Sequence, residues 1–114
     1  MRIEVKGRNC TVGDELRERI ERRFEKVGRQ VSPLAELDVE LREERNPSIH
    51  DAHIAEATLR LKGVTLRARS AADNMPHAVN LAADELARQV KRHRDKRRAR
   101  RAASKLEPRP APSP

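Results

Sequence analysis

The sequence predicts an α+β fold: a two-layer sandwich in which a four-stranded mixed sheet carries two helices on one face, in the order βαβββα. Four segments alternate polar and apolar residues with a period of two, which is typical of half-buried strands. Two other segments repeat apolar residues every three or four positions, as amphipathic helices do. Because every strand shows only one apolar side, both helices are expected to cover the same face of the sheet.

The first strand and the first helix are expected near the N-terminus. Residues 2–6 alternate as a strand does. The apolar residues that then share one helix face are Leu16, Ile20, Phe24 and Val27. Thr11, with Asp14 three residues later, predicts a weak capping box at the start of this helix, and Gly28 suits its end.

Three further strands are expected in the middle of the chain. Residues 37–42 alternate, and Asn46-Pro47-Ser48 interrupts the pattern before a loop. Residues 55–62 and 64–69 alternate in the same way, and Lys62-Gly63 predicts a tight turn between them. The first crossover should make strands one and two parallel through a right-handed connection, whereas the later strands form antiparallel hairpins.

The second helix is expected from about Asn74, with Pro76 in its first turn, where a missing N–H is harmless. Its buried face is predicted to consist of Ala78, Val79, Ala82, Leu86 and Val90. No apolar stripe continues beyond Val90, so residues 91–101 should project past the core. We therefore place one domain at residues 1–102 and a disordered, proline-rich tail at residues 103–114.

The composition predicts a small cytoplasmic protein with a thin core. The chain has 114 residues, of which 36% are hydrophobic, and Phe24 is its one aromatic residue. The lone Cys10 excludes an internal disulfide, which suits a reducing compartment. No stretch approaches the ~20 apolar residues of a membrane span, so we expect no membrane partner. We also expect this chain to be monomeric.

Little in the sequence points to catalysis, and we expect no enzyme, no small-molecule substrate and no cofactor. The chain has no P-loop, no glycine-rich dinucleotide turn, no G-x-S-x-G and no C-x-x-C. His50-Asp51-x-His53 is a poor metal motif, because no Cys or further His lies near it, and a polar loop is the favoured interpretation. Cys10 would need a neighbouring base to act as a nucleophile, so a small residue near a strand end is favoured.

Positive charge is concentrated where the second helix leaves the core. Ten of the 18 residues from Arg88 to Lys105 are Lys or Arg and only Asp95 is acidic, in a chain of net charge +8. A solvated helix face interleaves acids and bases, as the segment around Arg17 to Arg23 does, but acids are nearly absent here. The segment therefore favours contact with a polyanion.

The type of basic residue indicates which polyanion the segment binds. Arginine outnumbers lysine in the segment, which favours bidentate contacts with phosphates. The near-absence of aromatic residues argues against reading single strands by base stacking. Structured RNA, bound through its phosphates and its shape, fits this composition best.

Several segments, taken together with the order of elements, match a known pattern. They are Ile3–Asn9, Arg23–Val27, Asp51–Leu59, Asn74-Met75 and Leu86–Lys96. Across roughly residues 1–100 the chain resembles the ribosome hibernation promoting factors and ribosome-associated inhibitors. The most specific part of this resemblance is the helix end Arg88-Gln89-Val90-Lys91-Arg92, which follows the pattern Arg-Gln-x-x-(Lys/Arg).

The resemblance implies a domain that binds the small ribosomal subunit, its rRNA and its ribosomal proteins, in the decoding region. There it would occupy ground used by tRNA and mRNA and promote ribosome hibernation under stress. The RNA-binding residues that the resemblance implies by position are Arg23, Lys26, Arg29, Arg88, Lys91, Arg92 and Lys96, and Arg97 joins them as part of the same basic segment. The secondary candidates, on the open sheet face, are Arg60, Lys62, Arg67 and Arg69. Lys26 and Arg29 could flank the second-helix residues if the two helices pack antiparallel.

The chain departs from the family pattern at three places. Asn74-Met75-Pro76 stands where the family usually has Asp-Met-Tyr, so any stacking by that tyrosine is lost. Glu85 stands where a basic residue is often found, which weakens that part of the basic surface. Long family members carry a further dimerising domain, and a chain ending at Pro114 fits both a short form and a long form cut in its linker.

Two alternative functions stay open. A double-stranded-RNA-binding module has a similar α-β-β-β-α core, but the parallel β-α-β opening counts against it. A protein-interaction regulator of a sigma factor is the other alternative, because a basic helix can also dock on an acidic protein surface. Co-sedimentation with ribosomal subunits, with and without nuclease, would discriminate among these functions.

Overall fold

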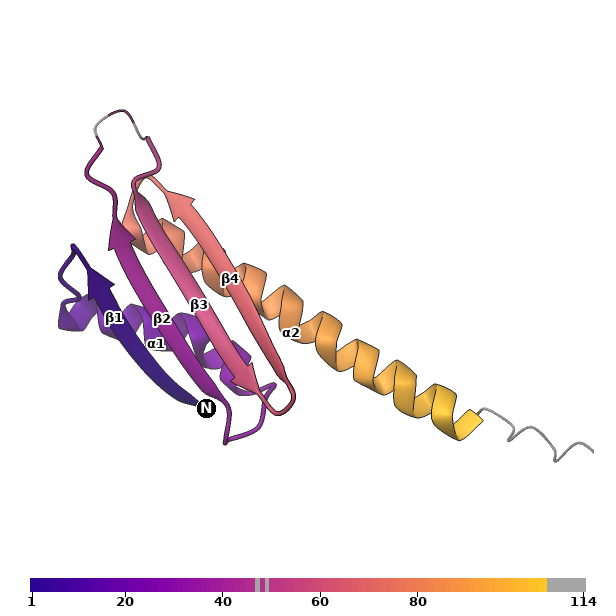
Figure 1. The fold of residues 1–114 in the computed structure, drawn as a ribbon. Helices are drawn as coiled ribbons and strands as arrows, with labels where there is room; N and C mark the ends of the chain where they lie inside the picture. The colour runs from indigo at the N-terminus through magenta and orange to yellow at the C-terminus, as the bar shows by residue number, and fades with distance from the viewer. Residues whose placement is uncertain (47, 49, 107–114) are drawn as a thin grey trace, which may run out of the picture.

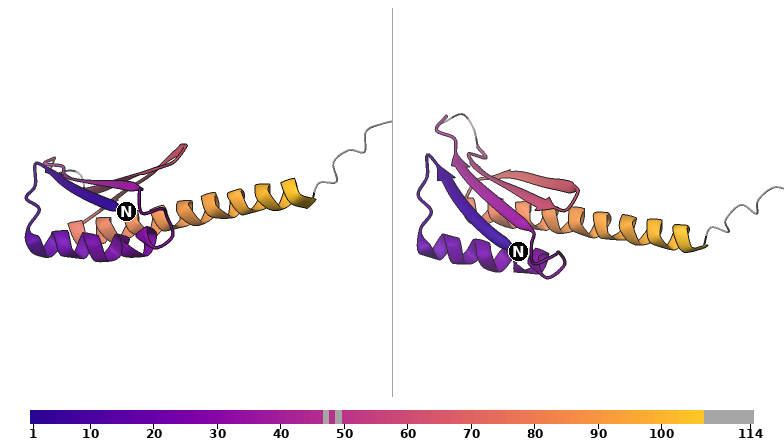
Figure 2. Two further views of the ribbon diagram at one scale, coloured as in Figure 1. Left: turned by 90° about the horizontal axis from the view of Figure 1, so that it is seen from below. Right: turned by 60° about the horizontal axis from the view of Figure 1, so that its bottom comes forward.

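The two-layer βαβββα architecture is confirmed by a computed structural model, which describes residues 1–46, 48 and 50–106 (Figure 1). The elements are β1 (Arg2–Arg8), α1 (Asp14–Gly28), β2 (Glu36–Glu43), β3 (His53–Leu61), β4 (Val64–Ala72) and α2 (Met75–Leu106). Both helices lie on one face of the sheet and the other face is open (Figure 2). β1, β2 and β4 extend one to three residues beyond the predicted limits, whereas β3 begins two residues earlier and ends one residue earlier than predicted. Pro47, which belongs to the predicted chain break, lies outside the described residues.

The four strands follow one another across the sheet in chain order. β1 and β2 are parallel, as predicted, with Ile3 opposite Leu37. β2, β3 and β4 pair antiparallel, with Leu37 opposite Leu59 and Leu59 opposite Leu66. Residues directly opposite each other point to the same face, so the apolar alternations of all four strands coincide on the helix side.

The two helices cover different halves of the sheet with residues of different size. α2 lies close to β3 and β4, and small residues on both surfaces are buried there, among them Ala57, Ala68 and, on the helix, Ala82. Fewer Cα atoms of α1 come close to those of the strands, because fully buried Ile20 and Phe24 fill the space between them. Alanine on both surfaces lets a helix backbone approach a sheet, whereas a large side chain keeps it at a distance.

Local backbone geometry explains why two positions, 7 and 63, are occupied by glycine. Gly63 has φ of 81°, so the predicted Lys62-Gly63 turn depends on the left-handed region that glycine occupies without strain. A Cβ on Gly7 would lie 2.6 Å from the carbonyl oxygen of Cys10, so the chain after β1 can turn back closely only because residue 7 has no side chain.

The helix starts were predicted with mixed success. The expected Thr11–Asp14 capping box is wrong: α1 begins at Asp14, its N-cap is Gly13, and no side chain bonds to its first turn. At α2 the side-chain Oδ1 of Asn74 accepts a hydrogen bond of 2.9 Å from the backbone N–H of His77, which is a normal N-cap, and Pro76 lies in the first turn as predicted.

The α2 helix is 32 residues long and continues well past the sheet (Figure 1). Its last buried residue is Val90, as predicted, so the stretch from Lys91 to Leu106, ~24 Å of helix, lies beyond the core. The helix ends four residues after the domain boundary proposed at residue 102. The predicted tail lies outside the described residues from 107 onward. No described helix is long and apolar enough to cross a membrane.

The two helices run in the same direction, so the antiparallel packing considered above is wrong. Arg23 pairs with Asp84 and Gln30 accepts a hydrogen bond from Arg94, so positions later in α1 meet positions later in α2. The strand directions require this arrangement, since α1 follows β1, α2 follows β4, and these two strands point the same way (Figure 1).

The packing of α2 predicts a contrast between two leucines of that helix. Leu86→Ala removes a side chain that is fully buried between helix and sheet, and should lower the free energy of unfolding by about 2–5 kcal/mol. Leu81→Ala, at a residue that is 38% exposed, should change it by no more than ~0.5 kcal/mol. Urea denaturation followed by circular dichroism measures both, and equal losses would contradict the burial described here.

Candidate nucleic-acid interface

The exposed side of α2 carries a row of cations, which we call the α2 row: Arg88, Lys91, Arg92 and Lys96. All four side chains belong to exposed residues. Arg88, Arg92 and Lys96 follow one another at i, i+4 spacing and Lys91 lies beside them, so neighbouring cations are ~6 Å apart, which is the spacing scale of phosphates along an RNA strand. Since α2 is anchored through Leu86 and Val90, the row begins on the packed part of the helix and continues onto the projecting part.

Two carboxylates, Glu85 and Asp95, lie along the α2 row, and among the described residues only Glu85 is paired with its arginines. Glu85 accepts hydrogen bonds from Arg88 at 2.9 and 3.1 Å and forms an ion pair of 3.6 Å with Arg92. Gln89 donates a further hydrogen bond of 3.3 Å to the same carboxylate. The hydrogen bonds from Arg88 and Gln89 are the main cause that lowers the pKa of Glu85, so this residue stays ionised in mildly acidic solution and offsets part of the positive charge.

The first-helix candidates are arranged less uniformly. Arg23 reaches across to Asp84 of α2 at 3.2 Å. Arg29 lies just after the helix, at its C-cap, and pairs with Glu25 at 3.0 Å. Lys26 has no carboxylate within 4.0 Å among the described residues. Because the helices are parallel and Arg23 lies against Asp84, Lys26 lies farther along α1 on the way toward Lys91, which is two helical turns beyond Asp84.

The existing ion pairs would not prevent phosphate binding. Ion pairs between exposed side chains contribute about 0–1 kcal/mol, and an arginine gains more from a bidentate bond to a phosphate. Arg23, Arg88 and Arg92 can therefore exchange their carboxylates for RNA. Among the described residues, Lys91 and Lys96 form no ion pair and need no such exchange.

Arg97 does not belong to the α2 row. It follows Arg88 by nine positions, about half a turn around the helix axis, and so lies on the opposite side of α2. There it lines a cleft at the base of the projecting helix together with Val90 and His93. The structure thus separates Arg97 from the residues with which it was grouped.

The secondary candidates lie on a surface of mixed charge. Arg60 forms an ion pair with Asp38 of the neighbouring strand, and Arg69 lies opposite Glu56. Lys62 is located in the β3–β4 turn rather than on the open face, and it lines the same cleft as Arg97. Within the described part of the chain, Arg67 and Arg69 are the two cations of this set that lie on the open face, are exposed and form no ion pair. The open sheet face is therefore a weaker candidate than the α2 row.

The titratable groups elsewhere offer little chemistry. Burial raises the pKa of the Cys10 thiol, against a lowering by the backbone of Arg8, so the thiol stays protonated at neutral pH. Its Sγ donates to the carbonyl of Leu41 at 3.4 Å. His53 approaches Glu43 at 3.9 Å, and the described residues contain no group of three or more His, Cys, Asp or Glu that could hold a metal ion.

One contact at the α2 row was not anticipated from the sequence. The side-chain amide of Gln89 donates a hydrogen bond of 2.7 Å to the backbone carbonyl of Arg67 in the edge strand β4. The bond joins the helix to the outer edge of the sheet immediately beside the row. Gln89 was recognised as part of a motif, but only the strand register shows which carbonyl it meets.

Comparison with known proteins places these features in context. Residues 3–98 match the model of a family described as Sigma 54 modulation protein / S30EA ribosomal protein. A ribosome hibernation promotion factor of Picosynechococcus sp. is 29% identical over 97 residues, covering 84% of this chain and 50% of that protein, so the chain spans half of its length. The ribosome hibernation promoting factor of Acinetobacter guillouiae is 30% identical over 99 residues, covering 82% and 88%.

Two solved structures share the fold. The crystal structure of the Thermus thermophilus Protein Y N-terminal domain has a TM-score of 0.70 and 26% identity, covering 82% of this chain and 99% of that one. A ribosomal subunit interface protein from Coxiella burnetii has a TM-score of 0.68 at 20% identity, covering 83% and 99%.

Glu85 provides the first test of this surface. Glu85→Gln removes the carboxylate shared by Arg88 and Arg92, so affinity for structured RNA should rise about threefold, as expected for deleting one negative charge ~6 Å from a phosphate in water. Glu18→Gln, an equal charge change on the exposed side of α1, serves as the control and should have a smaller effect. Filter binding at fixed salt measures both. Equal gains would show that net charge alone, and not the α2 row, determines affinity.

Proposed function

The chain belongs to the family of sigma 54 modulation proteins and S30EA ribosomal proteins, and on that premise we propose that it is a ribosome-binding hibernation factor that inhibits translation. The resemblance drawn from the sequence is confirmed by the family match and by the relatives named as ribosome hibernation promoting factors. Such a factor is not an enzyme, and its place of action is the cytoplasm, where ribosomes translate.

The observation that carries the proposal is the α2 row on an anchored helix. Four exposed cations follow one side of α2, and the charged segment continues beyond the core to Lys105. A surface of this kind neutralises consecutive phosphates without reading bases. Phe24, the one Phe, Tyr or Trp of the chain, is buried, so no such side chain is exposed as a platform for stacked bases.

We place the binding site on the small subunit, in the decoding region along the path of tRNA and mRNA. Support comes from the charge and shape of the domain: a narrow sandwich with a protruding basic helix suits a channel whose walls are rRNA (Figure 2). A protein bound there excludes tRNA and mRNA by occupying their space, and needs neither cofactor nor catalytic group. The domain would act as a monomer, with contacts to rRNA and to ribosomal proteins.

A sigma-factor regulator is the second candidate, because the matched family model is also described as a sigma 54 modulation protein. The two functions differ in the acidic partner that the basic helix would bind: rRNA in the first and an acidic protein surface in the second. Sedimentation of the purified protein with 30S subunits on a sucrose gradient, together with footprinting of the 16S rRNA, tests the first function directly. Protection outside the decoding region would refute the location, and failure to sediment with either subunit would refute ribosome binding altogether.

The proposal predicts steep salt dependence. Neutralising about six to eight phosphates releases their condensed counterions, so the logarithm of affinity for 30S subunits should fall with the logarithm of salt concentration at a slope of roughly −4 to −7. Titrations between low and moderate potassium chloride measure the slope. A flat dependence would contradict phosphate contact and would favour a protein partner.

The α2 row predicts that affinity for 30S subunits depends on where the cations lie and not only on net charge. Replacing Arg88, Lys91, Arg92 and Lys96 together by Gln should weaken 30S binding by about two to three orders of magnitude and relieve inhibition of translation in vitro, because about four phosphate contacts are lost. Neutral glutamines avoid the carboxylate cluster that charge reversal would create beside Glu85.

The matched control removes the same charge elsewhere. Gln substitutions at Arg2, Lys6, Arg17 and Arg19, all exposed, give the same net charge and should reduce binding by no more than about tenfold. Circular dichroism should be unchanged in both variants, since neither alters the core. Equal losses of binding would show that the α2 row is not the contact surface.

A further inference from the structure

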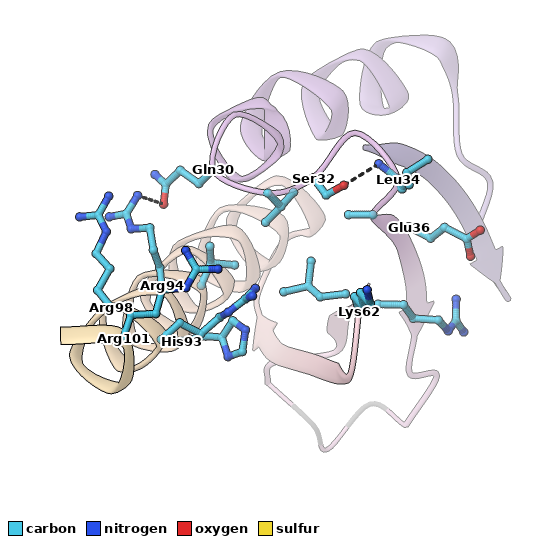
Figure 3. A pocket seen from close by; sticks show the side chains of 15 residues that line it. Gln30, Ser32, Leu34, Glu36, Lys62, His93, Arg94, Arg98 and Arg101 are labelled. Atoms are coloured by element: carbon cyan, nitrogen blue, oxygen red, sulfur yellow. Dashed lines mark hydrogen bonds between the residues drawn. The ribbon is translucent and has the colours of Figure 1, made fainter. Parts of the chain in front are cut away.

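A cleft lies where α2 leaves the sheet, centred on the side of the helix that carries Arg97 and away from Arg88, Arg92 and Lys96. It has a volume of about 690 Å³ and is bounded by the α1–β2 loop, the β3–β4 turn and the underside of α2. Figure 3 shows Arg94, Arg98 and Arg101 on the helix at one side of it, and Leu34 and Lys62 at the other. Its size falls within the range of ordinary ligand sites.

The floor of the cleft is aliphatic. Val31, Leu61 and Val90 line it, and each of them also packs against the core. Leu34 stands at its edge with 89% of its surface exposed, the largest exposure of any large hydrophobic residue in the described part of the chain. Leu34 and the floor together form a continuous apolar surface rimmed by polar residues, which is typical of a surface that a partner covers.

The rim of the cleft is strongly basic. Six cations line it, against one carboxylate, Glu36: the cations are Arg60, Lys62, Arg94, Arg97, Arg98 and Arg101. Arg94 is incompletely bonded, since among the described residues its one side-chain hydrogen bond is the long contact of 3.4 Å from Nη1 to Gln30. A ligand carboxylate arriving beside it would supply acceptors that the domain itself does not.

We propose that this cleft binds a short segment of a partner protein in which one or two bulky apolar side chains are flanked by carboxylates. The apolar side chains would cover Leu34 and the aliphatic floor, and the carboxylates would pair with the arginines of the rim. RNA is the less suitable occupant, because its phosphates and riboses would leave Leu34 and the aliphatic floor uncovered. The proposal does not depend on ribosome binding, which we assign to the α2 row.

The test uses the whole chain and three labelled probes. They are the peptide Glu-Glu-Leu-Phe-Asp-Glu, the peptide Glu-Glu-Ser-Ser-Asp-Glu of equal charge, and an octamer of uridine. Fluorescence anisotropy at moderate salt should show that the first peptide binds at least about tenfold more tightly than the second, which is the contribution expected from burying a large apolar side chain. In NMR spectra the methyl groups of Val31, Leu34 and Leu61 should shift with the first peptide.

Two matched pairs of variants locate the site. Leu34→Ser should weaken the Leu-Phe peptide about tenfold, whereas Leu81→Ser, at an exposed leucine outside the cleft, should leave its affinity within about twofold. Arg101→Glu should weaken it at least about threefold more than Arg100→Glu, because Arg101 lines the cleft and Arg100 does not. The exposure of Leu34 and of both arginines makes these changes harmless to folding.

Three results would overturn the proposal. Equal affinity for the two peptides would show diffuse attraction to the basic helix. Equal effects within either pair of variants would show that the cleft is not the site. A Leu34→Ser variant that loses uridine binding but keeps peptide binding would make the cleft an RNA site. Leu34→Ser changes no charge, so 30S binding should persist in this variant. Failure of the peptide proposal can therefore be distinguished from failure of the proposed ribosome binding.

Discussion

The close seating of α2 on β3 and β4 is the contact on which the other features depend. Alanines on both surfaces, among them Ala57, Ala68 and Ala82, allow the helix backbone to approach the sheet, and Leu86 and Val90 secure it where it leaves. With this anchorage a basic helix can extend past the core in a fixed direction. The packing of α2 on the sheet also determines which residues of the helix face solvent, and therefore which cations form the α2 row.

Charge is distributed differently over three surfaces of one small domain. The α2 row is positive, with Glu85 as the one carboxylate bonded to its arginines. The open sheet face mixes signs, since Arg60 and Arg8 are each paired with an acid of β2. The cleft on the far side of α2 combines cations with aliphatic residues. Phosphate binding needs only the first of these arrangements, so the excess arginines of the cleft call for a separate explanation.

The fold could be predicted from the sequence because its pattern is regular and its topology is simple. Period-two alternation identified all four strands, and the shared apolar side implied the two layers. The parallel direction of the two helices could also have been predicted, because the expected strand directions determine it. The antiparallel packing considered above did not take the strand directions into account. Arg97 lies on the side of α2 opposite Arg88 because nine residues rotate a helix position by about half a turn, and its RNA-binding role stays a prediction.

What the sequence could not provide were partners brought together by folding. That Arg23 would meet Asp84 depends on how two helices pack on a sheet, which no local pattern reveals. Gln89 finds the carbonyl of Arg67 only through the register of β4. The cleft joins residues from a loop, a turn and a helix end. The RNA-contacting roles of individual cations remain predictions, because the structure gives their arrangement but not their ligand.

The stretch of α2 beyond Val90 has little tertiary contact to sustain it, and beyond Arg94 its described residues are exposed. Its helicity rests on local propensity, and a succession of like charges works against it through their mutual repulsion. Screening by salt or neutralisation by a polyanion relieves that repulsion, so helix formation in this stretch is thermodynamically linked to its electrostatic surroundings. A bound polyanion then orders backbone as well as side chains, and the conformational entropy lost in that ordering lowers the net affinity. The final turns of α2 are therefore a separate, weakly cooperative unit, whose amide hydrogens exchange faster than those of the helix above the sheet.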